Sequence, residues 1–465
     1  ILGPRLTELA SAAGEDHLLS AAGPVLAALR DKTHESAQLY RRQGDVRICV
    51  ANAERPIGLR DSIPVGATMS MQGGSAAQVL LAWEEPDRLH RGLVGARFTA
   101  TMLSSGTEKY GEEALRDESN RIGVTVSAAA GPENTTISFA SLSRRQNLSD
   151  GLKLANQIIA RPKFDPAVLI RTKGQALTSL KQSLSDPGFL AGRAVTLLNY
   201  GSHPYANSAR SSEESINGIT LEDLSQFHRS HYAKNNAYVA IVGDIDRRQA
   251  EKTAAAVLEG LPAQAAARTE IPEIPNNAGR RQDIPFDGKE QASVIMGLPL
   301  IVRQDPDRYA LAVGNYILGG GGFDSRLMKK LRDEKGLVYG VSSSLSPMTR
   351  KGPFSIAFST KKDSAEDALA AARAVLADFI AEGPTEAELK QAKDNIVGSF
   401  PMTFDTNAKT VAIAANVGAN DLPLDYYDTY TAHIEAVTAE QVREVWRRRL
   451  NPQELNVVVV GKGGR

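Results

Sequence analysis

The pattern of apolar and polar positions along the chain predicts helices that alternate with pairs of strands. Amphipathic runs bounded by capping residues and glycines are typical of helices, and short β-branched runs are typical of strands. The expected elements are a helix at 110–122, two strands within 124–142, helices at 150–160 and after Asp165-Pro166, a helix at 325–335, strands at 337–345 and 353–359, a helix at 364–381, and a helix from Thr385 with Glu388 in a capping box. Helices packed on largely antiparallel hairpins give an α+β layer architecture.

The chain also repeats itself. The stretch "ITLEDLSQFHRSHYAKNNAYVAIVGD" at 219–244 matches "VTAEQVREVWRRRLNPQELNVVVVGK" at 437–462, because each opens with a Thr N-cap, runs as a helix and ends in a β-branched strand before Gly. A second pair agrees, "ALRDESNRIGVTVSAAA" from Ala114 and "KLRDEKGLVYGVSSSL" from Lys330. The two offsets are 218 and 216 residues. We therefore expect two copies of one domain of about 200 residues.

The repeats and the composition together predict four parts of the chain. Residues 261–286 contain four prolines, few apolar residues and no periodicity, which is typical of an extended interdomain linker. The first 45 residues have helical patches but no counterpart in the second copy, so we expect an N-terminal appendage of uncertain order at 1–45. The two copies then occupy 46–260 and 287–465.

Composition and charge exclude several classes of function. Lys and Arg together number 54, as do Asp and Glu, and this balance argues against nucleic acid as the main partner. The single cysteine, Cys49 in "VRICVA", excludes an internal disulfide and a cysteine-based zinc site, and we expect it to be an apolar strand residue. No apolar run reaches 18 residues, so we expect no membrane span. The start at Ile1 is compatible with an exported chain that has lost a signal peptide, or with a trimmed piece of a chain.

Several motifs of catalysis and binding are missing from the sequence. The glycine stretch "GGGGFDSR" has neither the Lys nor the hydroxyl at the position that a phosphate loop requires, and the dinucleotide fingerprint is absent. No H-E-x-x-H or H-x-x-E-H zinc motif occurs, and His228 and His231 in "HRSH" are best explained as ordinary helix residues. No G-x-S-x-G nucleophile elbow occurs either.

Arg332 and Tyr339 form the most informative pair of polar residues. A helix from Ser325 is expected to end at Gly336, which places Arg332 on its last turn and Tyr339 early in the next strand. A permanent cation and a phenol at one spot can stabilise an oxyanion or hold a carbonyl. From spacing alone, the pair is explained better by an Arg that complements the helix dipole and a Tyr packed in a sheet.

These residues resemble those of a known family, the pitrilysin/insulinase-type inverted zinc metallopeptidases, which includes mitochondrial processing peptidase and small bacterial relatives. The stretch "NYILGGGGFDSRLMKKLRDEKGLVYGVSSSLSPM" is similar to the hallmark of the family's C-terminal domain, and the resemblance covers about 92–462, including the stretches from His203 and Glu388. It implies a processing-peptidase-like fold of two duplicated domains, each a mainly antiparallel sheet covered by helices. It also implies that Arg332 and Tyr339 bind substrate and stabilise the tetrahedral intermediate. The hypothesis for the loop is that its backbone contacts an extended substrate, through Gly319, Gly320, Gly321, Gly322 and Phe323.

The sequence departs from the family where zinc should bind. Arg97, Ala100 and Thr101 stand where the family has His, Glu and His, and no acidic residue occurs between Asp165 and Asp186, where the third ligand is expected. The resemblance therefore implies a zinc-less subunit of a two-subunit, periplasmic or alternatively cytoplasmic, metallopeptidase that cleaves unstructured peptides. It would be inactive alone and bind no cofactor, while a homologous H-x-x-E-H subunit carries the zinc. Two alternatives stay open, a structural pseudo-peptidase and a peptide-binding module.

Overall fold

The computed structural model describes residues 16–33, 36–43, 46–54, 63–70, 86–266, 270–287 and 290–461. The chain divides into two compact units. One contains Ile1–Arg88 together with Ala267–Glu270, and the other contains Leu89–Ala266 and Ile271–Arg465. Among the described residues, no helix is both long enough and apolar enough to cross a bilayer.

The described residues of the first unit form a helix and a small antiparallel sheet. Helix α2 (Asp16–Thr33) precedes β1 (Ala37–Gln43), β2 (Val46–Ala53) and β3 (Thr68–Ser70), and the strand order is β1-β2-β3. Cys49 lies fully buried in β2, which confirms its prediction as an apolar strand residue. The predicted domain boundary between residues 45 and 46 is wrong, because it separates β1 from β2, which pair from Ala37↔Ala53 to Gln43↔Val46. The structure places the boundary near Arg88.

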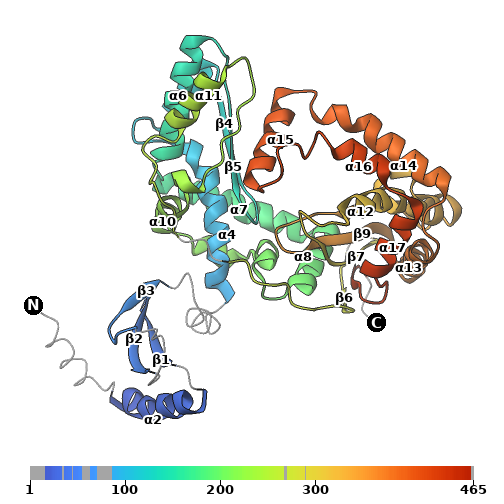
Figure 1. Ribbon diagram of the computed structural model, residues 1–465, viewed down its shortest axis with the longest axis horizontal. Coiled ribbons are helices and arrows are strands. Elements are labelled where there is room, and N and C mark those ends of the chain that lie inside the picture. The colour runs from blue at the N-terminus through green and yellow to red at the C-terminus, as the bar shows by residue number, and fades with distance from the viewer. Residues whose placement is uncertain are drawn as a thin grey trace, which may run out of the picture. The chain divides into compact units, whose positions relative to one another are not determined.

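The second unit begins with the first repeat, in which the described residues form a two-stranded hairpin. Its helices and strands are α4 (Pro86–Met102), α5 (Glu112–Ile122), β4 (Thr125–Ala130), β5 (Thr135–Ala140), α6 (Arg145–Ala160), α7 (Pro166–Leu184), α8 (Pro187–Tyr200), α9 (Glu213–Asn217), α10 (Leu221–His231) and α11 (Arg247–Val257), with short 3-10 turns at Leu103–Ser105, Pro204–Arg210 and Lys234–Asn236. Asp165 caps α7 by accepting from the Ala167 amide, as the Asp-Pro pair predicts. Figure 1 shows α6 and α11 together beside the hairpin.

The second repeat is built around a five-stranded sheet. Its elements are β6 (Arg281–Ile284), β7 (Gln291–Ile301), α12 (Arg308–Asn315), η4 (Tyr316–Gly320), η5 (Gly322–Asp324), η6 (Met328–Glu334), β8 (Val338–Leu345), β9 (Gly352–Lys361), η7 (Lys362–Ser364), α13 (Ala365–Glu382), α14 (Glu386–Ser399), η8 (Phe400–Thr403), α15 (Asn407–Ala419), α16 (Tyr430–Ala436), α17 (Ala439–Arg449) and β10 (Asn456–Val460). The order is β6-β10-β7-β9-β8, and only β6 and β10 run parallel. Trp446 of α17 is fully buried between the rings of Phe354 and Phe379 and joins the sheet to α13.

The expected α+β class and the duplication are confirmed. Each repeat runs through a helix, an antiparallel strand pair and two further helices, and Thr385 and Glu388 form the expected capping box of α14. Two predictions need correction. The β-branched stretch at 238–242 forms no strand, although its counterpart β10 does. The predicted linker at 261–286 includes β6, because parallel pairing with β10 recruits Arg281–Ile284 into the sheet.

Candidate functional site

Arg332 lies where the sequence predicts it, on the last turn of a helix, but the turn is a π-helix. Residues of η6 (Met328–Glu334) form this widened turn, and a second π-helical turn, η4, includes Gly319 and Gly320 of the glycine stretch. Gly336 ends the helix with φ +60°, a conformation that glycine adopts without strain, and its amide donates to the Arg332 carbonyl at 3.0 Å. Widened turns of this kind are rare and occur often at functional sites.

Tyr339 lies in a bulge on the edge strand of the sheet. Val338 pairs with Thr360 and Val341 with Phe358, so Tyr339 and Gly340 together face one residue of β9. Such a bulge turns a side chain away from the regular direction of the strand. The Tyr339 side chain is 73% exposed. It is therefore not the tyrosine packed in a sheet that the spacing alone favours.

The guanidinium of Arg332 lies over the ring of Phe323, 4.9 Å from its centroid. Arg332 is exposed, and Phe323 is 70% exposed although it is a large apolar residue. A cation over an aromatic face is stabilised by about 0.5–1 kcal/mol at exposed sites. The glycine stretch and the π-helical turn thus hold a cation and an apolar ring at the surface together.

The four glycines differ in what they do. A Cβ on Gly319 would lie 2.5 Å from the Ser343 amide nitrogen of β8, and a Cβ on Gly320 or Gly321 would lie 2.8 or 2.7 Å from side-chain atoms of Asn315 and Tyr316. Gly322 has open space around it but a φ of +64°. Close packing therefore explains the first three glycines, and backbone conformation explains the fourth. Their role in substrate binding stays a prediction.

A hollow of the surface lies beside the bulge. It is lined by the N-terminus of α8 and by the three strands β7, β9 and β8, and the lining residues are Gly188, Ser293, Val294, Ile295, Gly340, Ala357, Phe358 and Ser359. Most of these side chains are small, so the sheet face is open next to Tyr339. An extended chain could lie there against the backbone of the bulge.

The positions expected to hold zinc in the family lie on α4. Ala100 is buried, whereas Arg97 and Thr101 are exposed. Across the described part of the chain, no three His, Cys, Asp or Glu side chains come together in an arrangement that could hold a metal. His228 is buried on α10, where its Nε2 lies 2.7 Å from the Ile159 carbonyl, and burial lowers its pKa. Its structural role is thereby accounted for.

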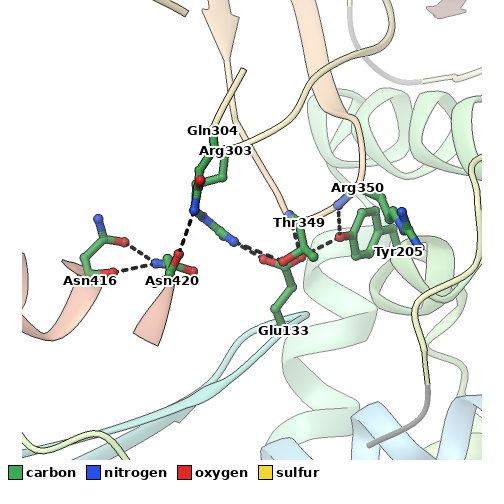
Figure 2. A network of polar contacts seen from close by, with 8 residues as sticks. All are labelled: Glu133, Tyr205, Arg303, Gln304, Thr349, Arg350, Asn416 and Asn420. Atoms are coloured by element: carbon green, nitrogen blue, oxygen red, sulfur yellow. Dashed lines mark hydrogen bonds and ion pairs between the residues drawn. The ribbon is translucent and has the colours of Figure 1, made fainter. Parts of the chain in front are cut away.

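Glu133 connects the first repeat to the second. It lies in the turn between β4 and β5, and its carboxylate accepts from Arg303 Nη2 at 2.6 Å and from the Thr349 amide at 2.9 Å. The hydroxyl of Tyr205 also donates to it and itself accepts from the Arg350 amide at 3.0 Å (Figure 2). Because the Glu133 and Arg303 side chains are only 11% and 23% exposed, this ion pair is well shielded from water.

The contacts of His203 and the burial of Tyr205 determine the position and protonation of the Tyr205 hydroxyl in this network. His203 Nδ1 accepts from the Tyr205 amide at 3.1 Å, so its Nε2 carries the proton and donates to the Pro272 carbonyl at 3.0 Å. Both side chains are buried, with ring centroids 4.6 Å apart. Burial raises the pKa of Tyr205, which therefore stays protonated and able to donate at neutral pH. The network holds the β4–β5 hairpin against the strand ends of the second repeat.

Comparisons with known proteins agree with this architecture. A family model described as Insulinase (Peptidase family M16) matches residues 91–208, and one described as Peptidase M16 inactive domain matches residues 218–396. A crystal structure of a peptidase M16 inactive domain from Pseudomonas fluorescens is 32% identical, with a TM-score of 0.77, over 82% of this chain and 91% of that chain. The chain belongs to the M16 peptidase family.

Other relatives of this M16 chain carry different descriptions. A protein of Helicobacter pylori named non-peptidase homolog YmxG is 25% identical over 366 residues, which are 78% of this chain and 84% of that protein. An uncharacterized zinc protease of Streptomyces coelicolor is 28% identical over 284 residues, 59% of this chain and 61% of that protein. A third family model, bacterial transcriptional regulator IclR C-terminal, matches residues 10–136. This match overlaps the first compact unit and runs into the start of the M16 match.

Sequence reasoning finds Arg332, Tyr339 and the glycine stretch of this M16 chain, but it misses the network around Glu133. The stretch "HPY" from His203 contributes to the family resemblance without indicating a role. Tyr205 of this stretch donates to Glu133, which pairs with Arg303. Glu133 and Arg303 are 170 residues apart in sequence, and neither lies in a recognisable local motif. The available signal was weak, a lone Glu in the hairpin turn "GPEN".

Proposed function

We propose that this M16 chain is the non-zinc-binding subunit of a heterodimeric zinc metalloendopeptidase that cleaves unstructured peptides. The observation that carries the proposal is the exposed Tyr339 in a bulge of the edge strand β8. A tyrosine kept only for packing would bury its ring, and an edge bulge is a common way to direct a side chain toward a ligand. The exposed pair of Arg332 and Phe323 lies on η6 and η5, and η6 packs against β8.

Each of these residues has a distinct part in the proposal. Tyr339 donates its hydroxyl to the oxyanion that forms when water attacks the peptide carbonyl, and Arg332 supplies a permanent positive charge to the same substrate. The ring of Phe323 offers an apolar contact beside that charge. Zinc held by a partner subunit would supply Lewis-acid chemistry there, for the carbonyl and for the attacking water. The hollow beside Gly340 gives room for an extended peptide.

Two observations support a chain that is inactive alone. The positions expected for the zinc ligands and the general base are Arg97, Ala100 and Thr101, and none of these side chains can replace a His ligand or a carboxylate base. The solved structure that is 32% identical to this chain is described as an M16 inactive domain. A purely structural role would leave the exposed Tyr339 without a chemical purpose.

The test is reconstitution with a zinc-binding partner. The chain is purified alone and mixed with an M16 homologue that carries H-x-x-E-H from the same genome, and cleavage of a quenched fluorescent peptide and zinc content are measured. We expect no activity and no stoichiometric zinc for the chain alone, and activity for the mixture. Tyr339→Phe should lower kcat of the mixture by about 100-fold, the loss typical of one oxyanion donor.

Tyr110→Phe is the matched control, because Tyr110 is a half-buried tyrosine of the first repeat, remote in sequence from the bulge. It should leave kcat and KM unchanged. Arg332→Ala should raise KM more than it lowers kcat if the charge mainly holds substrate. A mixture that gains no activity, or a Tyr339→Phe mixture that cleaves at the wild-type rate, would overturn the proposal in favour of a structural or peptide-binding role.

A further inference from the structure

The position of the Tyr339 side chain depends on the backbone on either side of it. Within the described part of the chain, no residue forms a hydrogen bond with its hydroxyl, and the ring is largely exposed. The direction of the side chain is therefore set by the conformation of the bulge that carries it. A bulge interrupts the regular pairing of a strand, so contacts outside the ladder are needed to fix this conformation.

One such contact lies immediately before the bulge. The hydroxyl of Thr360, on the neighbouring strand β9, donates to the Leu337 carbonyl at 2.6 Å. Thr360 is only 1% exposed, so water competes little for this hydrogen bond. The Leu337 amide in turn donates to the Leu331 carbonyl at 2.8 Å, which ties the residue before β8 to η6.

A second contact lies immediately after the bulge. The Val341 amide donates to Met328 Sδ at 3.3 Å, and both side chains are 6% exposed. A thioether sulfur is a weak acceptor, but an aliphatic side chain of similar size accepts no hydrogen bond at all. The sulfur of Met328 therefore does something that its apolar neighbours in the core cannot do.

The same sulfur connects the two residues of the proposed oxyanion site. Met328 is the first residue of η6, the π-helical turn on which Arg332 lies four residues later. Val341 follows Tyr339 by two residues on β8. The hydrogen bond from Val341 to Met328 thus joins the turn that carries Arg332 to the bulge that carries Tyr339.

We propose that Thr360 and Met328 are positioning residues, which hold the bulge at its two ends and thereby direct the Tyr339 hydroxyl toward the oxyanion. The catalytic part of this inference rests on the proposed function, whereas the part that concerns the conformation of the bulge does not. Because both residues act through Tyr339, their loss should affect the chemical step only while the Tyr339 hydroxyl is present.

Two variants remove these hydrogen bonds with little change of shape. Met328→Leu keeps an apolar side chain of similar volume but no acceptor, and Thr360→Val keeps the β-branched shape but no hydroxyl. Met296→Leu is the matched control for the first, because Met296 is fully buried in β7 of the same sheet and forms no hydrogen bond with a described residue. Thr360→Ser is the matched control for the second, since it keeps the hydroxyl.

Peptide cleavage by the reconstituted mixture measures the effect on the chemical step. A misplaced Tyr339 hydroxyl should cost no more than its removal, for which we expect a loss of about 100-fold in kcat. We expect Met328→Leu and Thr360→Val each to lower kcat about tenfold at an unchanged KM. In a chain that also carries Tyr339→Phe, each should lower kcat by less than about twofold more. The two controls should keep kcat within about twofold of the wild type.

Amide hydrogen exchange of the full chain alone gives a measurement that requires no peptidase activity. It is followed residue by residue by mass spectrometry with fragmentation of the peptides. Exchange of the Val341 amide should become about fivefold faster in Met328→Leu, the factor that one neutral hydrogen bond contributes. It should stay unchanged in Met296→Leu. The Leu337 amide should exchange faster in Thr360→Val and at the wild-type rate in Thr360→Ser.

Three results would each overturn the proposal. The first is an equal loss of kcat with and without the Tyr339 hydroxyl, which would show a general structural effect. The second is an active mixture in which Met328→Leu and Thr360→Val leave kcat unchanged, and the third is unchanged exchange at Val341 and Leu337 in these variants. If the wild-type mixture does not cleave, the proposed function fails, and the exchange rates alone decide whether the two residues hold the bulge.

Discussion

Replacing Glu133 by Gln is the substitution whose effect the structure defines most closely. The carboxylate is 11% exposed and accepts hydrogen bonds from Arg303, Tyr205 and the Thr349 amide. A Gln side chain has nearly the same shape, but it offers one acceptor oxygen and an NH₂ group that donates. The Glu133→Gln variant would lose the charge that pairs with Arg303. Its NH₂ group would also face one of the groups that donate to the carboxylate in the wild type, so that hydrogen bond would be lost.

The expected cost follows from the burial of the pair. A hydrogen bond to a charged group contributes about 1.5–3 kcal/mol, and breaking a fully buried ion pair costs about 3–5 kcal/mol. Arg303 is 23% exposed, so water compensates part of the loss. We expect the free energy of local opening to fall by about 2–3 kcal/mol. At about 1.4 kcal/mol per factor of ten, amide exchange in the β4–β5 turn and at residues 346–350 should become about 30- to 150-fold faster.

The matched control is Glu112→Gln. Glu112 also pairs with an arginine, Arg171 at 2.5 Å, but the two side chains are 41% and 51% exposed. An exposed pair contributes less than about 1 kcal/mol, so exchange in the control should change by less than about fivefold. Unchanged exchange in Glu133→Gln, or an equal effect of Glu112→Gln, would refute the reasoning that burial makes the Glu133 network a major link between the repeats.

The pH dependence gives an independent check on the same residue. Burial alone would raise the pKa of Glu133, but the hydrogen bonds from Tyr205, Arg303 and Thr349 lower it below the ordinary value. Because the folded pKa is the lower one, the stabilisation is fully present above the unfolded pKa of about 4.3 and is lost as pH falls through the folded pKa. In urea unfolding, the difference between wild type and Glu133→Gln should therefore be largest near pH 7 and shrink below about pH 4.

Further predictions concern the glycine stretch and the half-buried ion pair of Arg326 and Glu388. Gly319→Ala should destabilise the chain by several kcal/mol in urea unfolding, because the new Cβ would lie 2.5 Å from the Ser343 amide nitrogen. Gly322→Ala should cost only about 1–2 kcal/mol, the strain of a left-handed conformation. Equal losses of stability in the two variants would contradict the packing argument. Burial alone would raise the pKa of Glu388, but hydrogen bonds led by Arg326 lower it to about 2. Glu388→Gln should thus destabilise the chain by about 1–3 kcal/mol at pH 7. The stability difference between wild type and variant should decline as pH falls from about 4.3 toward the pKa of Glu388 in the folded chain. A loss of stability that does not depend on pH would count against an ionised Glu388.

The sequence predicts the candidate site better than it predicts the contacts that hold it. Arg332 and Tyr339 can be placed because a capping glycine and a strand start fix their positions within one short stretch. The bulge at Tyr339 could not be predicted, since it depends on the register between β8 and β9 rather than on residues near Tyr339. The link between Glu133 and Arg303 depends on two chain segments 170 residues apart, and no local pattern records such a contact.

The contrast between residues 238–242 and β10 shows why a strand pattern alone does not make a strand. Both stretches follow a capped helix, both are rich in β-branched residues, and both end in a glycine with positive φ, at Gly243 and Gly461. What differs is the neighbours: β10 lies between β6 and β7, which satisfy its backbone and bury its side chains. Without such neighbours an extended segment gains neither hydrogen bonds nor burial to offset the entropy of ordering it. Among the described residues no strand pairs with 238–242, so the pattern of this stretch is that of a strand while its conformation is not.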